Sequence, residues 1–81
     1  MNTSVANSNA LALAAAVWFT DNSLNVRLLD GRELAVPLEW FPRLREATGV
    51  QRADWRLIGM GVGIHWEDLD EDISVAALLR S

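Results

Sequence analysis

The sequence predicts an α+β fold: a small antiparallel sheet of four to five strands (two hairpins), with a short central helix and a C-terminal helix packed on one face. Three observations support this fold. Apolar and polar residues alternate over residues 24–28, which is typical of a half-buried strand. Turn signals at Asp30-Gly31 and in the glycine-rich residues 59–63 separate such segments. Good helix formers follow Pro42 and fill the C-terminal residues.

The first strand is expected at Ala14–Phe19, because this apolar stretch leads into a polar turn. Residues 20–23, Thr-Asp-Asn-Ser, predict that turn, since Asn and Asp hydrogen-bond to their own backbone and tolerate left-handed conformations. The second strand covers residues 24–28. A third follows Asp30-Gly31, and together the three form the first part of the sheet.

The register between the second and third strands can be argued from their apolar faces. A two-residue turn at Asp30-Gly31 mixes apolar with charged residues across the pair. A three-residue loop that ends at a left-handed Gly31 instead pairs Val26 with Leu34 and Leu24 with Val36. Because a shift of one residue destroys this apolar face, we predict the three-residue loop with its glycine bulge.

Proline and glycine predict the limits of the middle region. Pro37 ends the third strand, and Pro42 begins a short helix, where its missing N–H costs nothing. Gly49 is expected to cap the C-terminus of that helix. Residues 51–54 are expected to form another helical turn.

The second half of the chain predicts a hairpin and a final helix. The hairpin strands are Trp55–Ile58 and residues 64–66, joined by the glycine-rich residues 59–63. This loop is interpreted as a tight reversal, with close approach of a partner backbone as the alternative. After an acidic loop, residues 74–80 form the last helix, with Asp72 or Ser74 as its N-cap.

Length and composition indicate one domain with a packed core. Of the 81 residues, 51% are hydrophobic and four are Trp. We expect residues 1–9 to be a disordered tail and residues 10–81 to be a single α+β domain. The four Trp are expected in the core, with Trp40 beside Pro42 as the partly exposed one.

Two features of the N-terminal residues predict a cytoplasmic protein that does not enter a membrane. The apolar stretch at residues 10–19 is too short to span a bilayer. A secretory signal begins with basic residues, and no arginine precedes Arg27.

The charge argues against a nucleic-acid binder. The net charge is −4, and five of the eleven acidic residues lie within residues 67–72. Contacts to phosphates require clustered Arg or Lys. Arg43, Arg45, Arg52 and Arg56 offer at most a modest basic face, and pairing with neighbouring carboxylates is favoured for them.

One histidine lies near a group of carboxylates. His65 with Asp70, Glu71 and Asp72 could bind a divalent metal or perform acid–base chemistry. Capping and packing are favoured instead, because the histidine lies between two apolar residues of a strand. With its aromatic neighbours, this region gives a candidate interaction or functional cluster, namely Trp40, His65, Trp66, Asp70 and Asp72.

No catalytic set can be assembled from the sequence. There is no cysteine, only one histidine, and no Gly-x-Ser-x-Gly motif, so no nucleophile has a paired base. We therefore assign no catalytic residue, metal ligand or cofactor-binding residue, and we expect no cofactor.

Several segments together resemble the bacterial family known as domain of unknown function 2442. The resemblance covers residues 17 to 80 in the expected order, and the combination is specific although each piece alone is weak. The segments are Phe19-Thr20-Asp21, Asp30-Gly31-Arg32, Val36-Pro37-Leu38, Trp40-Phe41-Pro42-Arg43-Leu44, Ala47-Thr48, Gly63-Ile64-His65-Trp66, Asp70-Glu71-Asp72-Ile73-Ser74-Val75 and Leu78-Leu79.

The resemblance implies a small compact α+β protein and no known activity. Members are sometimes fused to a helix-turn-helix domain, and their genes often lie beside another small uncharacterised family, in an arrangement similar to toxin–antitoxin pairs. At position 67 this chain has Glu where the family favours Pro, which makes the loop less rigid and more acidic.

The leading hypothesis is a non-enzymatic protein-interaction or regulatory module, for example the antitoxin-like partner of a neighbouring small protein. It would bind a protein partner, or form a homo-oligomer through a sheet edge. The alternative is a small-ligand or metal-binding enzyme centred on His65 and the acidic loop. A third idea, an acidic surface that imitates nucleic acid, has weaker support.

Overall fold

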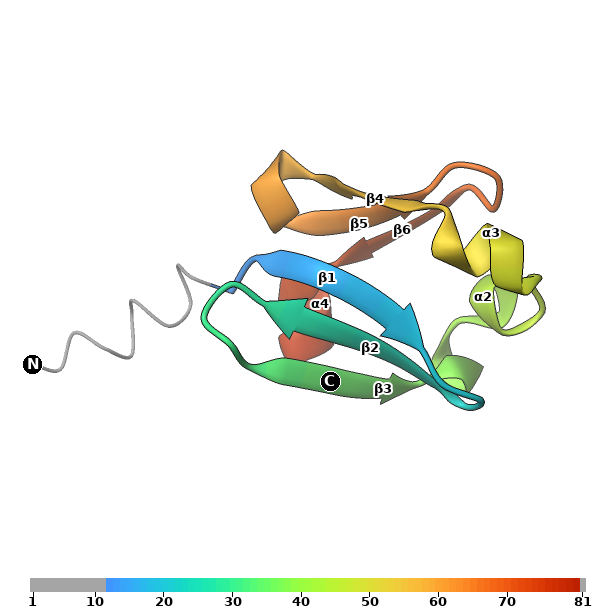
Figure 1. The fold of residues 1–81 in the computed structure, drawn as a ribbon, viewed down its shortest axis with the longest axis horizontal. Coiled ribbons are helices and arrows are strands. Elements are labelled where there is room, and N and C mark those ends of the chain that lie inside the picture. Colours follow the sequence, from blue (N-terminus) through green and yellow to red (C-terminus); the bar gives the residue numbers. More distant parts are fainter. Residues whose placement is uncertain (1–11, 81) are drawn as a thin grey trace, which may run out of the picture.

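The structure is a computed structural model that describes residues 12–80. It has six strands in two antiparallel three-stranded sheets, with orders β1-β2-β3 and β4-β5-β6. Three short helices and two 3-10 turns connect or flank the strands (Figure 1). The bounds are β1 Ala14–Phe19, β2 Ser23–Leu28, β3 Glu33–Pro37, η1 Leu38–Trp40, α2 Pro42–Arg45, α3 Gly49–Ala53, β4 Trp55–Ile58, η2 Gly59–Gly61, β5 Gly63–Trp66, β6 Glu71–Ser74 and α4 Val75–Arg80.

The prediction of a single sheet is wrong, although the α+β class and both hairpins are confirmed. After β3 the chain passes through η1, α2 and α3 before β4 begins, and these helices carry it to a separate sheet (Figure 1). Strands β1 and β4 contact each other without joining the two ladders. The predicted tail, residues 1–9, lies outside the residues that the structure describes.

The first hairpin has the predicted register. Val26 pairs with Leu34 and Leu24 pairs with Val36, as the three-residue loop requires. Gly31 has φ of +96°, and its N–H donates to the carbonyl of Leu28 at 3.0 Å. The three-residue loop, predicted because it keeps the apolar residues on one face, is therefore confirmed.

Part of the predicted acidic loop is a strand. Residues 71–74 form β6, whose Ile73 lies opposite Ile64 of β5. Of the two N-cap candidates for α4, Ser74 is the one used: its hydroxyl accepts from the N–H of Ala77 at 3.2 Å. Asp72 instead faces His65, as described below.

The assignment of Gly49 as a C-cap is also wrong, because Gly49 begins α3. Thr48 is the N-cap of that helix and forms a capping box with Gln51. The Thr48 hydroxyl accepts from the Gln51 N–H at 3.1 Å, and the Gln51 side chain accepts from the Thr48 N–H at 2.9 Å. The spacing Thr-x-x-Gln is the sequence signal for this motif.

Thr48→Ala is expected to lower the free energy of unfolding by about 1 kcal/mol, because it leaves the Gln51 N–H without its acceptor. Urea denaturation measures this change. Thr48→Ser keeps the oxygen and is the control, expected to stay near the parent. Equal losses in both variants would contradict a capping role.

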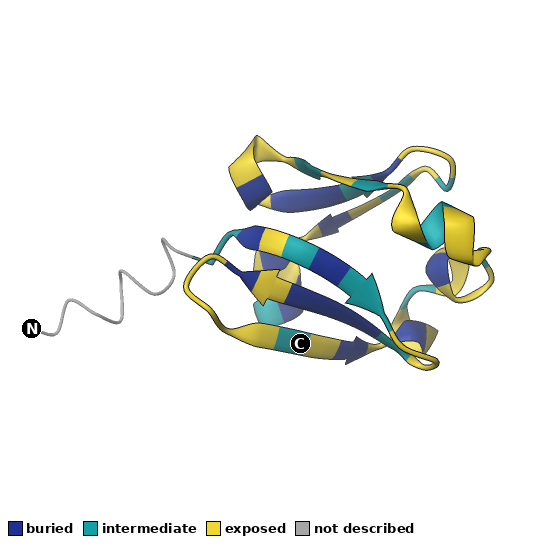
Figure 2. Cartoon of the chain, in the orientation of Figure 1, coloured by how far each residue is buried: buried dark blue, intermediate teal, exposed yellow. Residues whose placement is uncertain are grey.

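The core lies between the two sheets, with α2 and α3 at one end of the molecule and α4 in contact with β3 and β6 (Figure 1). Figure 2 shows that buried residues dominate β2 and β5, the central strands of the two sheets, whereas the other strands carry more exposed or half-buried positions. Trp66 is fully buried, with 0% of its surface exposed, whereas Trp40 is 51% exposed, as predicted. None of the helices in residues 12–80 is long and apolar enough to cross a membrane. The buried apolar residues are Ala14, Val17, Leu24, Val26, Leu28, Val36, Leu38, Leu44, Ile64, Trp66, Ile73, Val75 and Leu78.

Candidate functional site

The five residues of the predicted cluster do not form one site. His65 and Asp72 lie opposite each other on paired strands and are in contact. Trp66 points into the core, where its indole N–H donates to the carbonyl of Arg52 at 3.0 Å. Trp40 is in η1, and Asp70 is in the turn between β5 and β6. Only the His65–Asp72 pair therefore remains of the cluster.

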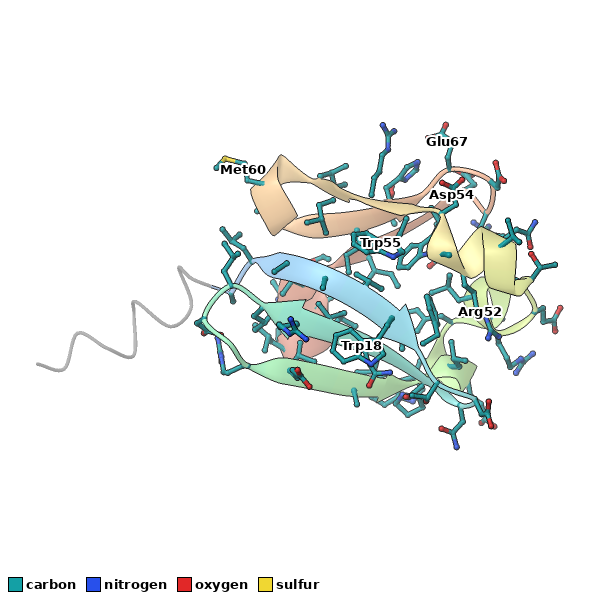
Figure 3. All side chains as sticks on the ribbon, viewed as in Figure 1. Trp18, Arg52, Asp54, Trp55, Met60 and Glu67 are labelled. Atoms are coloured by element: carbon teal, nitrogen blue, oxygen red, sulfur yellow. The ribbon has the colours of Figure 1, made fainter. Side chains whose placement is uncertain are left out.

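His65 lies in a row of charged side chains that crosses the second sheet. Its register partners are Arg56 on β4 and Asp72 on β6. Ile64 and Trp66, on either side of it, are buried, so strand alternation turns His65 to the opposite face. The row continues to Glu67, which follows β5 and is labelled in Figure 3.

Both ring nitrogens of His65 contact carboxylates. Nδ1 contacts Oδ1 of Asp72, and Nε2 lies 2.9 Å from Oε1 of Glu67. The same Glu67 oxygen accepts from Nη2 of Arg56 at 3.1 Å. His65 is largely enclosed, with 17% of its side chain exposed, while both carboxylates remain open to solvent. The imidazole is therefore held between two acceptors.

This arrangement favours the protonated ring. The hydrogen bond to Asp72, followed in importance by the one to Glu67, raises the pKa of His65 above its ordinary value, although desolvation opposes this shift. An imidazolium donates from both nitrogens, which matches two acceptors. In this state neither nitrogen is open to a substrate or a metal. Within residues 12–80, no group of three or more His, Asp or Glu could hold a metal ion.

Two neighbours of His65, Glu67 and Arg56, are not in the predicted cluster. Glu67 is two residues beyond His65, which is the spacing of one strand face and is the sequence signal for this contact. Arg56 is opposite His65 because Ile58 pairs with Gly63 around the turn. Predicting that Arg56 lies opposite His65 would have required the register of this second hairpin.

The acidic turn, residues 67–70 between β5 and β6, is held from outside the sheet by Arg43 of α2. The Arg43 guanidinium donates to the carbonyl of Asp70 at 2.6 Å and approaches that of Leu69 at 3.5 Å. Asp70 itself has φ of +52° in this turn. Arg43 therefore serves the architecture of the turn rather than a basic binding face.

The turn between β4 and β5 forms a second candidate site, at one end of the same sheet. Met60 at its centre is 87% exposed, and Figure 3 shows it projecting from the turn. Ile58 and Val62 are also exposed apolar residues. A hollow of about 280 Å³ adjoins them, and we refer to it with these three residues as the apolar tip. Its lining residues are Ile58, Gly59, Val62, Gly63, Asp72, Ile73 and Ser74.

The glycine-rich turn does allow a close backbone approach, and the backbone is the chain's own. A Cβ added to Gly61 would lie 2.6 Å from the carbonyl oxygen of Ala14 in β1. The turn also meets the last helix, because Val75 donates its N–H to the Val62 carbonyl at 3.0 Å. The apolar tip is therefore fixed to both β1 and α4.

Comparisons with known proteins give a family and a fold but no activity. A protein of unknown function from Rhodospirillum rubrum is 30% identical, with a TM-score of 0.71 over 84% of each chain. An uncharacterised protein from Chromobacterium violaceum is 21% identical, with a TM-score of 0.74 over 96% of this chain and 73% of that one, and shows the fold alone. A comparison with curated proteins finds no match. The model of the family described as protein of unknown function (DUF2442) matches residues 14–81, and the chain therefore belongs to that family.

Proposed function

We propose that this domain is a non-enzymatic protein-interaction module that binds a partner protein through the apolar tip. Three apolar side chains, Ile58, Met60 and Val62, are exposed within five consecutive residues of one turn. Within residues 12–80, the other exposed large apolar residues lie apart along the chain, with Leu29 in the turn after β2, Trp40 in η1 and Val50 in α3. Clustered exposed apolar surface beside a hollow is typical of an interaction site.

Met60 is the observation that carries the proposal. Its backbone is left-handed, with φ of +60° and ψ of 27°, and its side chain is 87% exposed. A left-handed residue other than Gly costs about 1–2 kcal/mol. Folding gains little from an exposed side chain, so neither packing nor the turn explains a methionine here. A flexible, polarizable methionine is well suited to fill a partner's surface.

The charge around the apolar tip indicates the chemistry of the partner. Asp72 lies at the rim of the hollow, and its side chain is largely exposed. It belongs to a segment, residues 67–72, that holds five of the eleven acidic residues of a chain with net charge −4. We infer a partner that places an apolar side chain in the hollow and a neighbouring Lys or Arg near Asp72.

The first candidate partner is the small protein encoded beside members of this family, as in an antitoxin-like pair. The alternative, a ligand- or metal-binding enzyme centred on His65, requires a ring nitrogen that is open to the ligand. Both nitrogens contact carboxylates instead. The interaction module is therefore the better-supported function.

Met60→Asn tests this proposal. Asn tolerates a left-handed backbone, so the variant is expected to fold at least as stably as the parent. It removes the apolar side chain and should weaken binding to the co-expressed neighbouring protein about 10- to 30-fold, as expected for a residue worth roughly 1.4–2 kcal/mol. Copurification followed by a binding titration measures this.

The matched control is Val50→Ser, which changes an 82% exposed apolar residue on α3, away from the apolar tip. Its binding should equal that of the parent. Equal affinities of Met60→Asn and the parent would refute the apolar tip as the binding site. If the protein instead self-associates and Met60→Asn abolishes this, a second copy is the partner.

A further inference from the structure

We propose that His65 is a proton-operated brace: in its protonated form it links both β6 and Glu67, the first residue of the acidic turn, to β5, and it loses the link to Glu67 when it loses one proton. The two ties are its contacts with Asp72 on β6 and with Glu67 at the start of the turn. The proposal does not rest on the binding function of the apolar tip, although Asp72 takes part in both.

The physical basis is the number of N–H donors on the ring. A protonated imidazole donates from both nitrogens, so it satisfies both carboxylates at once. A neutral imidazole has one N–H, and its second nitrogen carries a lone pair. A neutral ring cannot donate a hydrogen bond to both carboxylates, because one of them would face the lone pair. One of the two ties must therefore break.

The hydrogen bond that breaks is the one between His65 and Glu67. Asp72 is held opposite His65 by the pairing of β5 with β6, so it remains beside the ring. Glu67 follows the end of β5 and already accepts from Arg56 at 3.1 Å. When its bond to the ring is lost, Glu67 can keep this cation as its only partner. The neutral ring then retains its N–H toward Asp72.

The charged groups around the ring fix the direction of the pH dependence. Arg56 faces it from β4, Asp72 from β6, and Glu67 from the turn. The two carboxylates raise the pKa of His65. The brace is therefore complete below about pH 6.5, the ordinary pKa of histidine. It opens as the pH rises through the raised pKa, and its contribution to stability is lost over the same window.

An NMR pH titration of the whole chain tests the brace. Because the sequence has a single histidine, its ring signals report His65 without ambiguity. We expect the ring to titrate with a midpoint above that of histidine in an unstructured peptide. The backbone amides of residues 67–70 should shift with the same midpoint.

Glu67→Gln separates the brace from a merely structural histidine. A Gln side chain can accept from a protonated ring and donate to a neutral one, so its hydrogen bond to the ring should persist at every pH. The ring midpoint should fall, and the pH response of the turn amides should be lost. The matched control is Asp68→Asn, which changes an exposed acidic residue of the same turn. It should keep the ring midpoint and the pH response of the turn amides.

Two results would overturn the proposal. One is a set of turn amides that do not follow the His65 midpoint in the parent chain. The other is a Glu67→Gln variant whose turn amides respond to pH as strongly as those of Asp68→Asn. Both substitutions are at exposed positions, so the spectra will report on folded protein.

Discussion

Trp66→Ala is expected to lower the free energy of unfolding by about 3–5 kcal/mol, a large share of the stability of so small a domain. The side chain has 0% of its surface exposed. It meets Phe19 edge-on, with ring centroids 6.2 Å apart, and its N–H donates to the Arg52 carbonyl. Alanine leaves a cavity at the point where β1, α3 and β5 meet.

Urea denaturation followed by circular dichroism measures this loss, since the method does not depend on the tryptophan that is removed. Trp40→Ala is the control, because that side chain is half exposed, and it should cost less than about 1 kcal/mol. Similar losses for the two variants would show that Trp66 does not have the central place in the core that its burial indicates.

Gly61→Ala is expected to cost at least about 2 kcal/mol, for two reasons that add. The backbone of Gly61 has φ of +105°, which strains any residue with a Cβ. That Cβ would also lie 2.6 Å from the carbonyl oxygen and 2.9 Å from the nitrogen of Ala14. Backbone atoms of a paired strand cannot move aside as a flexible side chain can, so the turn and β1 must separate.

Gly31→Ala is the control that carries the first reason alone, so the difference between the two variants measures the second. Its φ of +96° is similar, but a Cβ there would meet nothing within 4 Å. Only the conformational strain of about 1–2 kcal/mol applies. Urea denaturation of both variants gives the difference. If Gly61→Ala is no more damaging than Gly31→Ala, the contact between the turn and β1 does not constrain the fold.

The sequence predicted those parts of the fold in which side-chain faces leave only one solution. The loop at Gly31 follows from the need to bury Leu24 and Val26 with their partners, and Pro42 begins α2 as expected. Strand β6 was missed because Glu-Asp-Ile-Ser has low strand propensity and one buried residue, Ile73. Its pairing depends on β5, which is a tertiary effect.

The division into two sheets could not be read from local pattern either. Whether β1 pairs with β4 depends on how α2 and α3 turn the chain, and residue periodicity contains no information on that path. The same limit applies to the candidate site. Of the predicted cluster, His65 and Asp72 are in contact, whereas Trp66 lies on the inward face of the same strand. The position of Arg56 opposite His65 depends on the register of the second hairpin.

In both sheets the strands are ordered in space as they are in the chain. Every ladder therefore joins consecutive strands, and each closes a short loop at a small entropic cost. We expect each sheet to be able to begin forming without the other, with the docking of the Trp66 face as the step that couples them. A domain built in this way should fold fast, and its slowest event should be the meeting of two preformed halves.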